Sequence, residues 1–408
     1  MSARLLAVCA AMIGIGLSPA LAAEHQHHMG AAAPGPDCPD AALACASVAT
    51  PAFAPDGTLW LVWTGGGRVM VAHSPDLGRS FGPAAAVTPA ATSLDTGPDS
   101  RPKIVVDGAG RVVVAYAIFK DKAFNGQVLV SRSIDGGHSF AAPRPLTRDP
   151  TSQRFEALAL DPGGRLFAAW IDKRSAFAAR AVGGKYAGAA LAFAWSDDGG
   201  DSFAAARIAQ ENSCECCRLG VGFAGPGRPV VLFRNVFGGT VRDHAVMTFA
   251  DPATPGPVYR VSVDDWETDV CPHHGPSLAV AADGSYHAAW FADGRARQGL
   301  FYARSTDGGR TFSAPMPLGA PDRQTSRPQV LAVPDGLWLA WKEFDGERTT
   351  VMAENSRDAG RTWTAPRPVA QTGDASDHPL LVSDGRHAFL SWQTQNEGYR
   401  LLPLEDGQ

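Results

Sequence analysis

Short runs of apolar residues alternate with clusters of Gly, Asp and Pro along nearly the whole chain. The pattern is clearest where runs at residues 103–106, 111–117 and 127–133 follow one another, each rich in β-branched residues. Residues 107–110 (DGAG) separate the first two runs. Runs of this kind predict strands joined by short turns. With a fourth strand that follows, they predict one antiparallel four-stranded unit.

This unit recurs along the chain. Its second strand is an apolar run that follows an Asp/Gly turn and ends near an aromatic residue. Seven units of roughly 50 residues predict an all-β propeller with seven four-stranded antiparallel blades, and six blades are the alternative. We expect the aromatic residues to pack between blades rather than to bind sugars. These residues are Trp63, Tyr116, Trp170, Phe233, Trp290, Trp341 and Trp392.

The last unit stops after three predicted strands, at residues 380–382, 387–394 and 399–404. We expect residues 43–47 to supply its missing outer strand and to close the ring. The propeller is predicted to span residues 46–408.

Five octets fit the pattern Ser-x-Asp-x-Gly-x-(Ser/Thr)-(Phe/Trp). The Asp and Ser side chains can hydrogen-bond the backbone of a tight turn, and the Gly can take the positive φ that such a turn needs. Each octet is therefore predicted to form a hairpin whose aromatic residue begins the next strand. The octets are residues 74–81, 133–140, 196–203, 305–312 and 356–363.

These octets resemble the Asp-box of sialidase-like (BNR-repeat) β-propellers, and the resemblance covers nearly the whole chain from about Ala46. It implies the fold but says little about function, because such folds include enzymes and binding modules. It also implies that the boxes lie on outer hairpins and that the start of each innermost strand faces a central funnel. The interval between Ser196 and Ser305 covers two units, which indicates that one box has been lost.

Residues 1–22 have the features of a secretory signal peptide. Arg4 supplies a basic start, the apolar run at residues 5–17 is too short to span a bilayer, and residues 20–22 form an A-x-A cleavage site. No other segment is apolar enough to cross a membrane, so the protein is predicted to be exported, to the periplasm or the medium. Charged residues make up 19% of the chain and the net charge is −5, which does not suggest a nucleic-acid or anionic-membrane partner.

Residues 23–45 are predicted to form a His-rich tail followed by an Ala/Gly/Pro-rich linker. After cleavage, the new N-terminus would begin Ala23-Glu24-His25. Its amine, two backbone amides and the His25 imidazole form a square-planar nitrogen set that suits Cu(II) or Ni(II). The alternative is a disordered His-rich tail without a specific ligand.

Arginines stand at several of the predicted funnel positions. Catalytic sialidases use an arginine triad, a Tyr–Glu nucleophile pair and an Asp, so the resemblance implies a glycoside hydrolase or glycan-binding module. Arg101, Arg154 and Arg327 are the candidate triad, since Arg binds carboxylates in bidentate fashion, and Glu156 and Asp99 are available carboxylates. The chain departs from that family, because Ser100-Arg101-Pro102 replaces the Phe/Tyr-Arg-Ile-Pro motif and no Tyr is singled out as a nucleophile. The alternative is that these arginines only form salt bridges across the funnel.

Two segments rich in Cys and His precede the innermost strands of the fourth and fifth units. Because these units are neighbours, we expect the two segments to converge. Thiolates and imidazoles are ligands of soft and borderline metals, so the segments predict a copper or zinc site. The predicted ligands are Cys214, Cys216, Cys217, Cys271, His273 and His274.

Disulfides are the alternative, because an exported chain with an even number of mature cysteines invites them. Cys38 and Cys45 are expected to form a local disulfide. Pairing among Cys214, Cys216 and Cys217 needs an unusual backbone, which favours metal binding there. A redox-active disulfide is a third interpretation of this cluster.

The leading hypothesis is an exported Asp-box propeller that binds a transition metal, copper or zinc, at the Cys/His cluster in its funnel. The alternative is a sialidase-type glycoside hydrolase or glycan-binding module acting through the funnel arginines, and whether the protein is an enzyme stays open. A structural interaction scaffold with disulfides is the third hypothesis. The predicted partner is thus a metal ion or a glycan.

Overall fold

The computed structural model describes residues 38, 45–269 and 273–405, and these residues fold almost entirely into antiparallel β-sheet. The described chain contains one α-helix, α1 (Arg174–Ala181). No helix in this part of the chain is long and apolar enough to cross a membrane. The predicted signal peptide and most of the predicted tail lie outside the described residues.

The strands pair in the order in which they occur in the sequence. The first group comprises β1 (Val48–Phe53), β2 (Leu59–Gly65), β3 (Arg68–Ser74) and β4 (Ala85–Ala86). The second group comprises β5 (Lys103–Val106), β6 (Val112–Phe119), β7 (Gly126–Ser133) and β8 (Arg144–Pro145). The third group comprises β9 (Gln153–Leu160), β10 (Leu166–Asp172), β11 (Ala189–Ser196) and β12 (Arg207–Ser213).

The fourth group comprises β13 (Gly220–Phe223), β14 (Pro229–Phe237), β15 (Val241–Thr248) and β16 (Val258–Arg260). One residue pair, Ser213 with Asn235, joins it to the third group. The fifth group comprises β17 (Ser277–Val280), β18 (Tyr286–Asp293), β19 (Gln298–Ser305) and β20 (Met316–Leu318). The sixth comprises β21 (Gln324–Val333), β22 (Gly336–Phe344), β23 (Thr349–Ser356) and β24 (Arg367–Thr372), and the last comprises β25 (Leu380–Ser383), β26 (Ala388–Thr394) and β27 (Gly398–Pro403).

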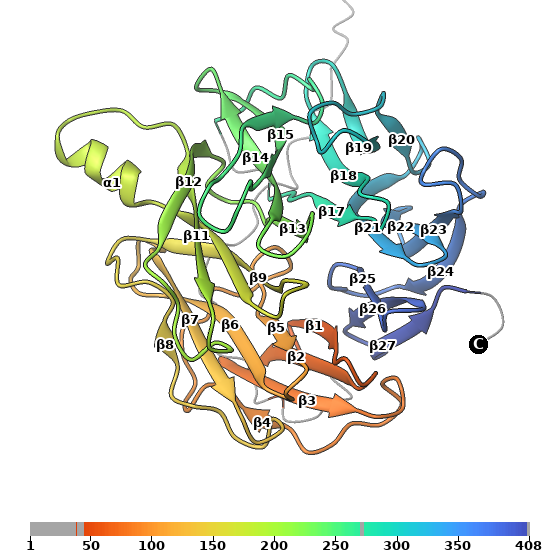
Figure 1. Cartoon of the computed structure of the whole chain (residues 1–408). Helices are drawn as coiled ribbons and strands as arrows, with labels where there is room; N and C mark the ends of the chain where they lie inside the picture. Colours follow the sequence, from red (N-terminus) through yellow and green to blue (C-terminus); the bar gives the residue numbers. More distant parts are fainter. Residues whose placement is uncertain (1–37, 39–44, 270–272, 406–408) are drawn as a thin grey trace, which may run out of the picture. The chain divides into compact units, whose positions relative to one another are not determined.

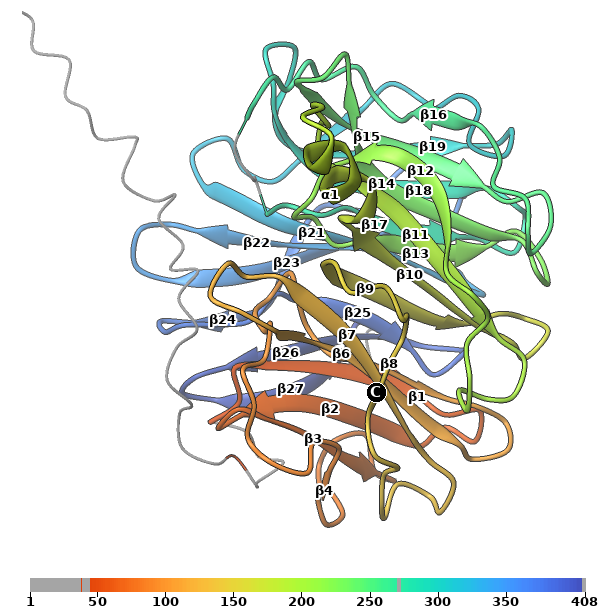
Figure 2. The ribbon, with the colours of Figure 1, turned by 90° about the vertical axis from the view of Figure 1, so that its left-hand side faces the viewer.

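The first strands of these groups contact one another in a closed order, from β1 through β5, β9, β13, β17, β21 and β25 back to β1. Figure 1 shows these strands towards the common centre of the sheets and the last strand of each group outside. Figure 2 shows the same sheets from the side, with α1 beside the third group. The order of groups matches the repeat units of the sequence.

The predicted aromatic residues occupy equivalent positions. Each lies on the second strand of its group, and Trp63, Trp170, Trp290, Trp341 and Trp392 have no exposed surface. Trp170 packs in a cluster that includes Val113 and other residues of the second group. The expectation that these residues pack between neighbouring groups is confirmed.

All five Asp-box octets begin at the last residue of the third strand of a group. In each box, the Ser Oγ donates to the Asp Oδ1, which also accepts the N–H of the following Ser or Thr. In the box that begins at Ser305, these distances are 2.7 and 3.0 Å. The boxes are therefore turns of the outer hairpins, as predicted. The expectation that the box aromatic residue begins the next strand is wrong, because that strand begins four residues later in each case.

The box glycine also fixes the spacing to the preceding group. A Cβ built at Gly137 would lie 2.5 Å from the Trp60 ring, and one built at Gly360 would lie 1.9 Å from the Tyr302 hydroxyl. The fit is looser at the first box, because a Cβ at Gly78 would lie 3.6 Å from the Tyr399 ring of the last group, an ordinary van der Waals contact. The turn glycine thus has a steric role between groups in addition to its positive φ.

The predicted closing strand at residues 43–47 is not found in its described part, residues 45–47. Instead, the Ser47 N–H donates to the Thr64 carbonyl at 2.8 Å, which extends the pairing of β1 with β2. The last group therefore has three strands among the described residues. The Ser47 N–H is thus bonded within the first group rather than to β27.

A buried ion pair closes the ring instead. Asp377, just before β25, pairs with Arg101, just before β5, and the Asp377 and Arg101 side chains are 1% and 5% exposed. Asp377 Oδ2 also accepts the Ala49 N–H at 3.2 Å, while Arg101 Nη1 donates to the Ala49 carbonyl at 3.1 Å. One carboxylate and one guanidinium thus join the last, first and second groups.

We expect Ser305→Ala to lower the free energy of unfolding by about 1–2 kcal/mol, because the buried Gly309 N–H loses the acceptor that lies 3.0 Å away. Urea denaturation measures the change. The exposed Ser93 is the control site, and Ser93→Ala should change stability by less than about 0.5 kcal/mol. Equal effects of the two substitutions would contradict a stabilising role for the Asp-box.

Asp377→Ala should lower the free energy of unfolding by about 3–5 kcal/mol, because it leaves the Arg101 guanidinium buried without its counter-ion. The control is Asp201→Ala, which removes the exposed partner of Arg132 and Arg144 and should cost less than about 1 kcal/mol. The double variant Arg101→Met/Asp377→Leu should recover part of the loss, since no unpaired charge remains. If the double variant is less stable than Asp377→Ala, the loss in Asp377→Ala does not come from the unpaired charge of Arg101, and the prediction is wrong.

Candidate functional site

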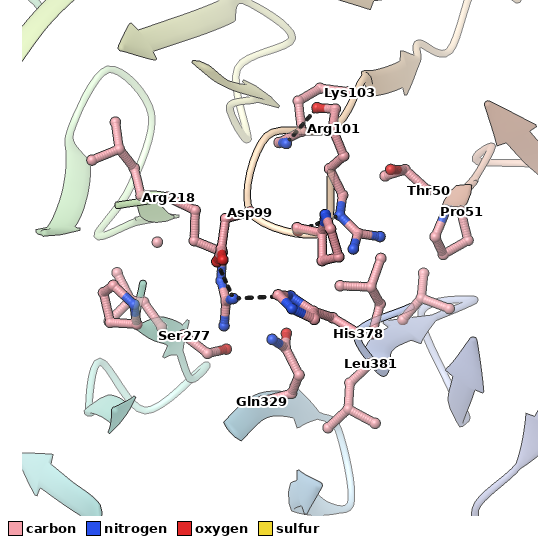
Figure 3. A pocket seen from close by; sticks show the side chains of 17 residues that line it. Thr50, Pro51, Asp99, Arg101, Lys103, Arg218, Ser277, Gln329, His378 and Leu381 are labelled. Atoms are coloured by element: carbon pink, nitrogen blue, oxygen red, sulfur yellow. Dashed lines mark hydrogen bonds and ion pairs between the residues drawn. The ribbon is translucent and has the colours of Figure 1, made fainter. Parts of the chain in front are cut away.

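A cavity of about 260 Å³ lies at the centre of the ring, among the first strands of six groups and the loops before them. Figure 3 shows Asp99 and Arg218 next to each other with His378 facing Arg218, whereas Pro51 and Leu381 lie beside Thr50 and Gln329. The charged and strongly polar residues that line the cavity are Asp99, Arg101, Lys103, Arg218, Gln329 and His378. The predicted funnel is therefore lined by cations with few carboxylates.

Asp99 is shared between two arginines. Its Oδ1 accepts from Arg218 Nη1 at 3.2 Å, and its Oδ2 accepts from Arg327 Nη1 at 2.9 Å. The Arg218 and Asp99 side chains are 14% and 10% exposed, so both are largely withdrawn from water. Burial lowers the pKa of Arg218 to about 10, although Asp99 opposes this shift. One carboxylate cannot saturate two guanidinium groups, and Arg218 Nη2 is buried with no hydrogen-bond partner.

The three arginines of the predicted triad have carboxylate partners. Arg101 binds Asp377 through both Nη atoms, and Arg154 binds Asp95 through Nε and Nη2, the latter at 2.9 Å. Arg327 shares Asp99. Arg101 lines the central cavity, whereas Arg154 and Arg327 are not among its lining residues. The structure therefore does not gather the three side chains around one ligand position.

Glu156 and Lys103 form a second unusual pair. Glu156 lies on β9 with 3% of its surface exposed, and neither carboxylate oxygen has a hydrogen-bond partner. Burial raises the pKa of Glu156 to about 7, and the charge of Lys103 opposes this shift. Burial lowers the pKa of Lys103 to about 8, opposed by Glu156. Lys103 Nζ donates to the Arg101 carbonyl at 2.8 Å, at the edge of the cavity.

Two further titratable side chains lie nearby. His378 is 4% exposed, and its Nδ1 lies 3.4 Å from Arg218 Nη1. Burial and then the neighbouring arginines hold the pKa of His378 well below its usual value, so the ring is neutral at pH 7. Burial also lowers the pKa of Lys342 to about 8, and its Nζ donates to Ser376 Oγ at 2.8 Å. Several groups beside the cavity thus titrate close to neutral pH or stay uncharged.

The backbone is strained at equivalent points around the site. Phe155, His273 and Arg327 are left-handed, with φ of 55°, 49° and 59°. Phe155 and Arg327 sit where the register of the first strand shifts against the second. Non-glycine residues take this conformation at a cost of about 1–3 kcal/mol, and such residues cluster at functional sites.

The predicted cysteine cluster is partly assembled. Cys214 Sγ lies 3.6 Å from Cys216 Sγ and 3.8 Å from Cys217 Sγ. All three sulfurs lie within 4.8 Å of one another, and the three residues are at most 2% exposed. Hydrogen bonds from the other two thiols hold the pKa of Cys214 well below its usual value, helped by Arg234 and Arg242. Within the described chain, no His, Asp or Glu joins this group.

The other predicted ligands lie elsewhere or outside the described residues. The His274 ring stacks on Phe291 with centroids 4.2 Å apart, and the His273 ring lies 6.3 Å from the Phe155 ring. Burial lowers the pKa of His273. Cys271 and His25 lie outside the described residues. Cys38 and Cys45 form the predicted disulfide.

Sequence analysis did not select Lys103, Arg218 or His378 as site residues. A signal for Lys103 was present, because it begins a short strand whose other residues, Ile104 to Val106, are apolar. Arg218 directly follows the predicted ligand Cys217, and His378 stands two residues before the predicted strand at residues 380–382. Their roles were hidden because Arg218 lies 119 residues from Asp99 and 160 residues from His378 in the chain.

No protein-family profile matches this chain, and no curated protein matches it in sequence. Among solved structures, the chain is similar to a polysaccharide lyase of family PL25, an ulvan lyase bound to -[GlcA(1-4)Rha3S]-. The two structures have a TM-score of 0.59 and 12% sequence identity, and the match covers 90% of this chain and 96% of that chain. The polysaccharide lyase Uly1 has a TM-score of 0.54 and 9% identity over 85% of this chain and 88% of that one. The chain is an all-β propeller. Other similar structures include a leech intramolecular trans-sialidase, with a TM-score of 0.49 and 11% identity over 85% of this chain and 82% of that one.

We expect the stability of the protein to fall as pH rises from about 4.5 to about 7, relative to Glu156→Gln. The folded protein keeps Glu156 protonated up to a pKa of about 7, whereas the unfolded chain loses this proton near 4.5. The unfolded state therefore binds fewer protons in this window, and the free energy of unfolding decreases with pH. Unfolding of the two proteins in urea across this pH range gives the difference, which should reach about 1–3 kcal/mol.

The control for this measurement is Glu347→Gln, since Glu347 is exposed. Its pH profile should run parallel to that of the parent protein. Parallel profiles for Glu156→Gln and the parent would contradict a protonated Glu156 at neutral pH.

Proposed function

We propose that this protein is an exported, seven-bladed propeller of the Asp-box type that acts on an acidic polysaccharide. Its central cavity binds the carboxylate of a uronate residue, and the chemistry is that of a polysaccharide lyase. The observation that carries this proposal is Arg218, whose Nη2 is buried beside the cavity without a partner. A ligand anion is the group that such a donor lacks, because a buried, unsatisfied guanidinium N–H is costly.

The charge of the cavity wall supports an anionic ligand. Arg101, Lys103 and Arg218 line it, whereas Asp99 is the one acidic residue among the described lining residues. Asp377 offsets Arg101, and Asp99 is divided between Arg218 and Arg327. The excess positive charge sits at the Arg218 side of the cavity, where guanidinium geometry suits a planar carboxylate.

The kinds of titratable group beside the cavity favour elimination over hydrolysis. Glycoside hydrolysis usually needs two carboxyl groups flanking the scissile bond. Asp99 is held by two arginines, and Glu156 is not among the lining residues, so the cavity offers no such pair within the described chain. Elimination instead needs a cation to neutralise the uronate carboxylate and a base to remove the proton on the carbon next to it.

Lys103 is the proposed base. With a pKa of about 8, part of the Lys103 population is neutral near pH 7 and can accept a proton. The electron pair of the broken C–H bond forms a carbon–carbon double bond, and the neighbouring carbon–oxygen bond to the leaving sugar breaks. That oxygen takes the proton from the Lys103 ammonium, which returns Lys103 to its neutral form. Arg218 stabilises the charge that develops on the carboxylate, while the neutral His378 ring beside it leaves that guanidinium charged and oriented.

The similar solved structures support this choice of substrate. Two of them are polysaccharide lyases, and one holds an oligosaccharide that contains glucuronate. The sialidase-type alternative uses Arg101, Arg154 and Arg327 together, and each of these arginines already has a carboxylate partner. Export to the periplasm or the medium, as the predicted signal peptide indicates, would bring the protein to such polymers.

Arg218→Ala should weaken binding of a glucuronate-containing oligosaccharide by about 10- to 100-fold, because the substitution removes one charge-assisted hydrogen-bonding group. Arg218→Lys should retain part of the affinity, because the charge remains. Isothermal titration with matched neutral and acidic oligosaccharides gives the affinities. The control is Arg144→Ala, which removes an arginine that is 56% exposed on β8 and should leave binding unchanged.

Turnover is followed by the absorbance of the unsaturated uronate product and, separately, by new reducing ends. Reducing ends without the double bond would identify a hydrolase, and release from an aryl sialoside would identify the sialidase alternative. Equal affinity for neutral and acidic oligosaccharides, or an Arg218→Ala variant that binds as well as the parent, would overturn the proposal.

A further inference from the structure

We propose that Cys214, Cys216 and Cys217 form a binding site for one thiophilic metal ion, Cu(I) or Zn(II). This site is separate from the proposed sugar site and lies in the connection between β12 and β13. Cys214 directly follows β12, and Cys217 directly precedes Arg218. The connection carries the chain from the third group of strands to the fourth.

The two sulfur separations that involve Cys214 are close to those around a bound metal ion, and the third pair lies within 4.8 Å. With a metal–sulfur bond of about 2.3 Å, two sulfurs lie about 3.8 Å apart in a tetrahedral site and about 4.0 Å apart in a trigonal one. Cys214 Sγ lies 3.6 and 3.8 Å from the other two sulfurs. An ion can therefore contact all three sulfurs after small movements of their side chains.

A disulfide fits the same geometry less well. Bonded sulfurs lie about 2.05 Å apart, so Cys214 would have to approach either of the other two sulfurs by more than 1 Å to form a disulfide. Bonds between residues two or three apart also need an unusual backbone. The cluster is packed against Phe155, Ile171 and Leu219, which limits how far the backbone can shift.

The surroundings compensate the charge of bound thiolates. Arg242 Nη1 donates to Cys214 Sγ at 3.3 Å, and Arg242 is 7% exposed. Arg234, which is 1% exposed, accepts the Cys214 N–H through its carbonyl at 2.8 Å. One buried guanidinium group, that of Arg242, thus stands next to a site whose donors, in the described chain, are sulfurs alone. Such a set selects soft ions over Mg²⁺ or Ca²⁺.

Binding is a proton exchange without electron transfer. Each thiol loses its proton to solvent as its sulfur bonds to the ion, and the ion keeps its oxidation state. Copper must therefore be supplied as Cu(I). Bound metal would fix the connection that ends at Arg218, which links the site physically to one wall of the central cavity.

The test uses the full chain with His25, His27 and His28 replaced by Ala, so that the tail does not bind the ion. The reduced protein is titrated with Cu(I) against a competing chelator under anaerobic conditions, and in a second arm with Zn(II). We expect one ion per chain in at least one arm, lost in Cys214→Ser and in Cys217→Ala. The matched control is Ser213→Ala, which changes the neighbouring residue and should leave stoichiometry at one.

X-ray absorption on the loaded parent protein provides a measurement that does not depend on the folding of a variant. It should show a sulfur shell at about 2.2–2.3 Å. The Cu(I) and Zn(II) arms decide which ion the site holds. The proposal is overturned if the reduced parent takes up neither ion, if uptake survives Cys214→Ser in a folded protein, or if the shell contains no sulfur.

Discussion

The ion pair between Arg101 and Asp377 is the constraint on which the central site depends. It joins residues 276 positions apart, and Asp377 also accepts the N–H groups of Ala49 and His378. In a ring, every group is positioned by two neighbours, so a break at the junction of the last and first groups would release all inner strands. Moving a buried ion pair out of water is costly. Unlike apolar packing, however, its hydrogen bonds are directional, and they fix the positions of three inner strands relative to one another at the cavity.

The same closure explains the charge pattern of the centre. Seven strands converge there, so side chains at their starts are forced together and desolvated. Desolvation moves the pKa values of Glu156, Lys103 and Lys342 towards neutrality and keeps His378 uncharged. Arginine stays charged under these conditions and needs counter-ions, which Asp95, Asp99 and Asp377 provide. Only Arg218 keeps a buried N–H group for a ligand among the cavity-lining arginines of the described chain.

The two proposed sites lie on either side of one peptide bond, that between Cys217 and Arg218. The cysteine cluster packs between the third and fourth groups, whereas Arg218 faces the cavity. A rigid connection at this point would hold the guanidinium where the sugar carboxylate binds. The sulfur cluster has no place in the proposed elimination, and its contribution there would be positional.

The repeat units, strand positions and Asp-box turns were determined by the sequence itself, because they depend on contacts between residues a few positions apart. The same holds for the Cys38–Cys45 disulfide, which spans seven residues. The convergence of three cysteines was also predictable, since they stand within four positions. Only the tertiary structure decided which arginines have partners, because Asp377 and Asp95 come from other groups of strands. It likewise decided that Lys103 and Glu156 titrate near neutral pH, since burial at the closed centre of the ring, rather than residue type, sets those pKa values.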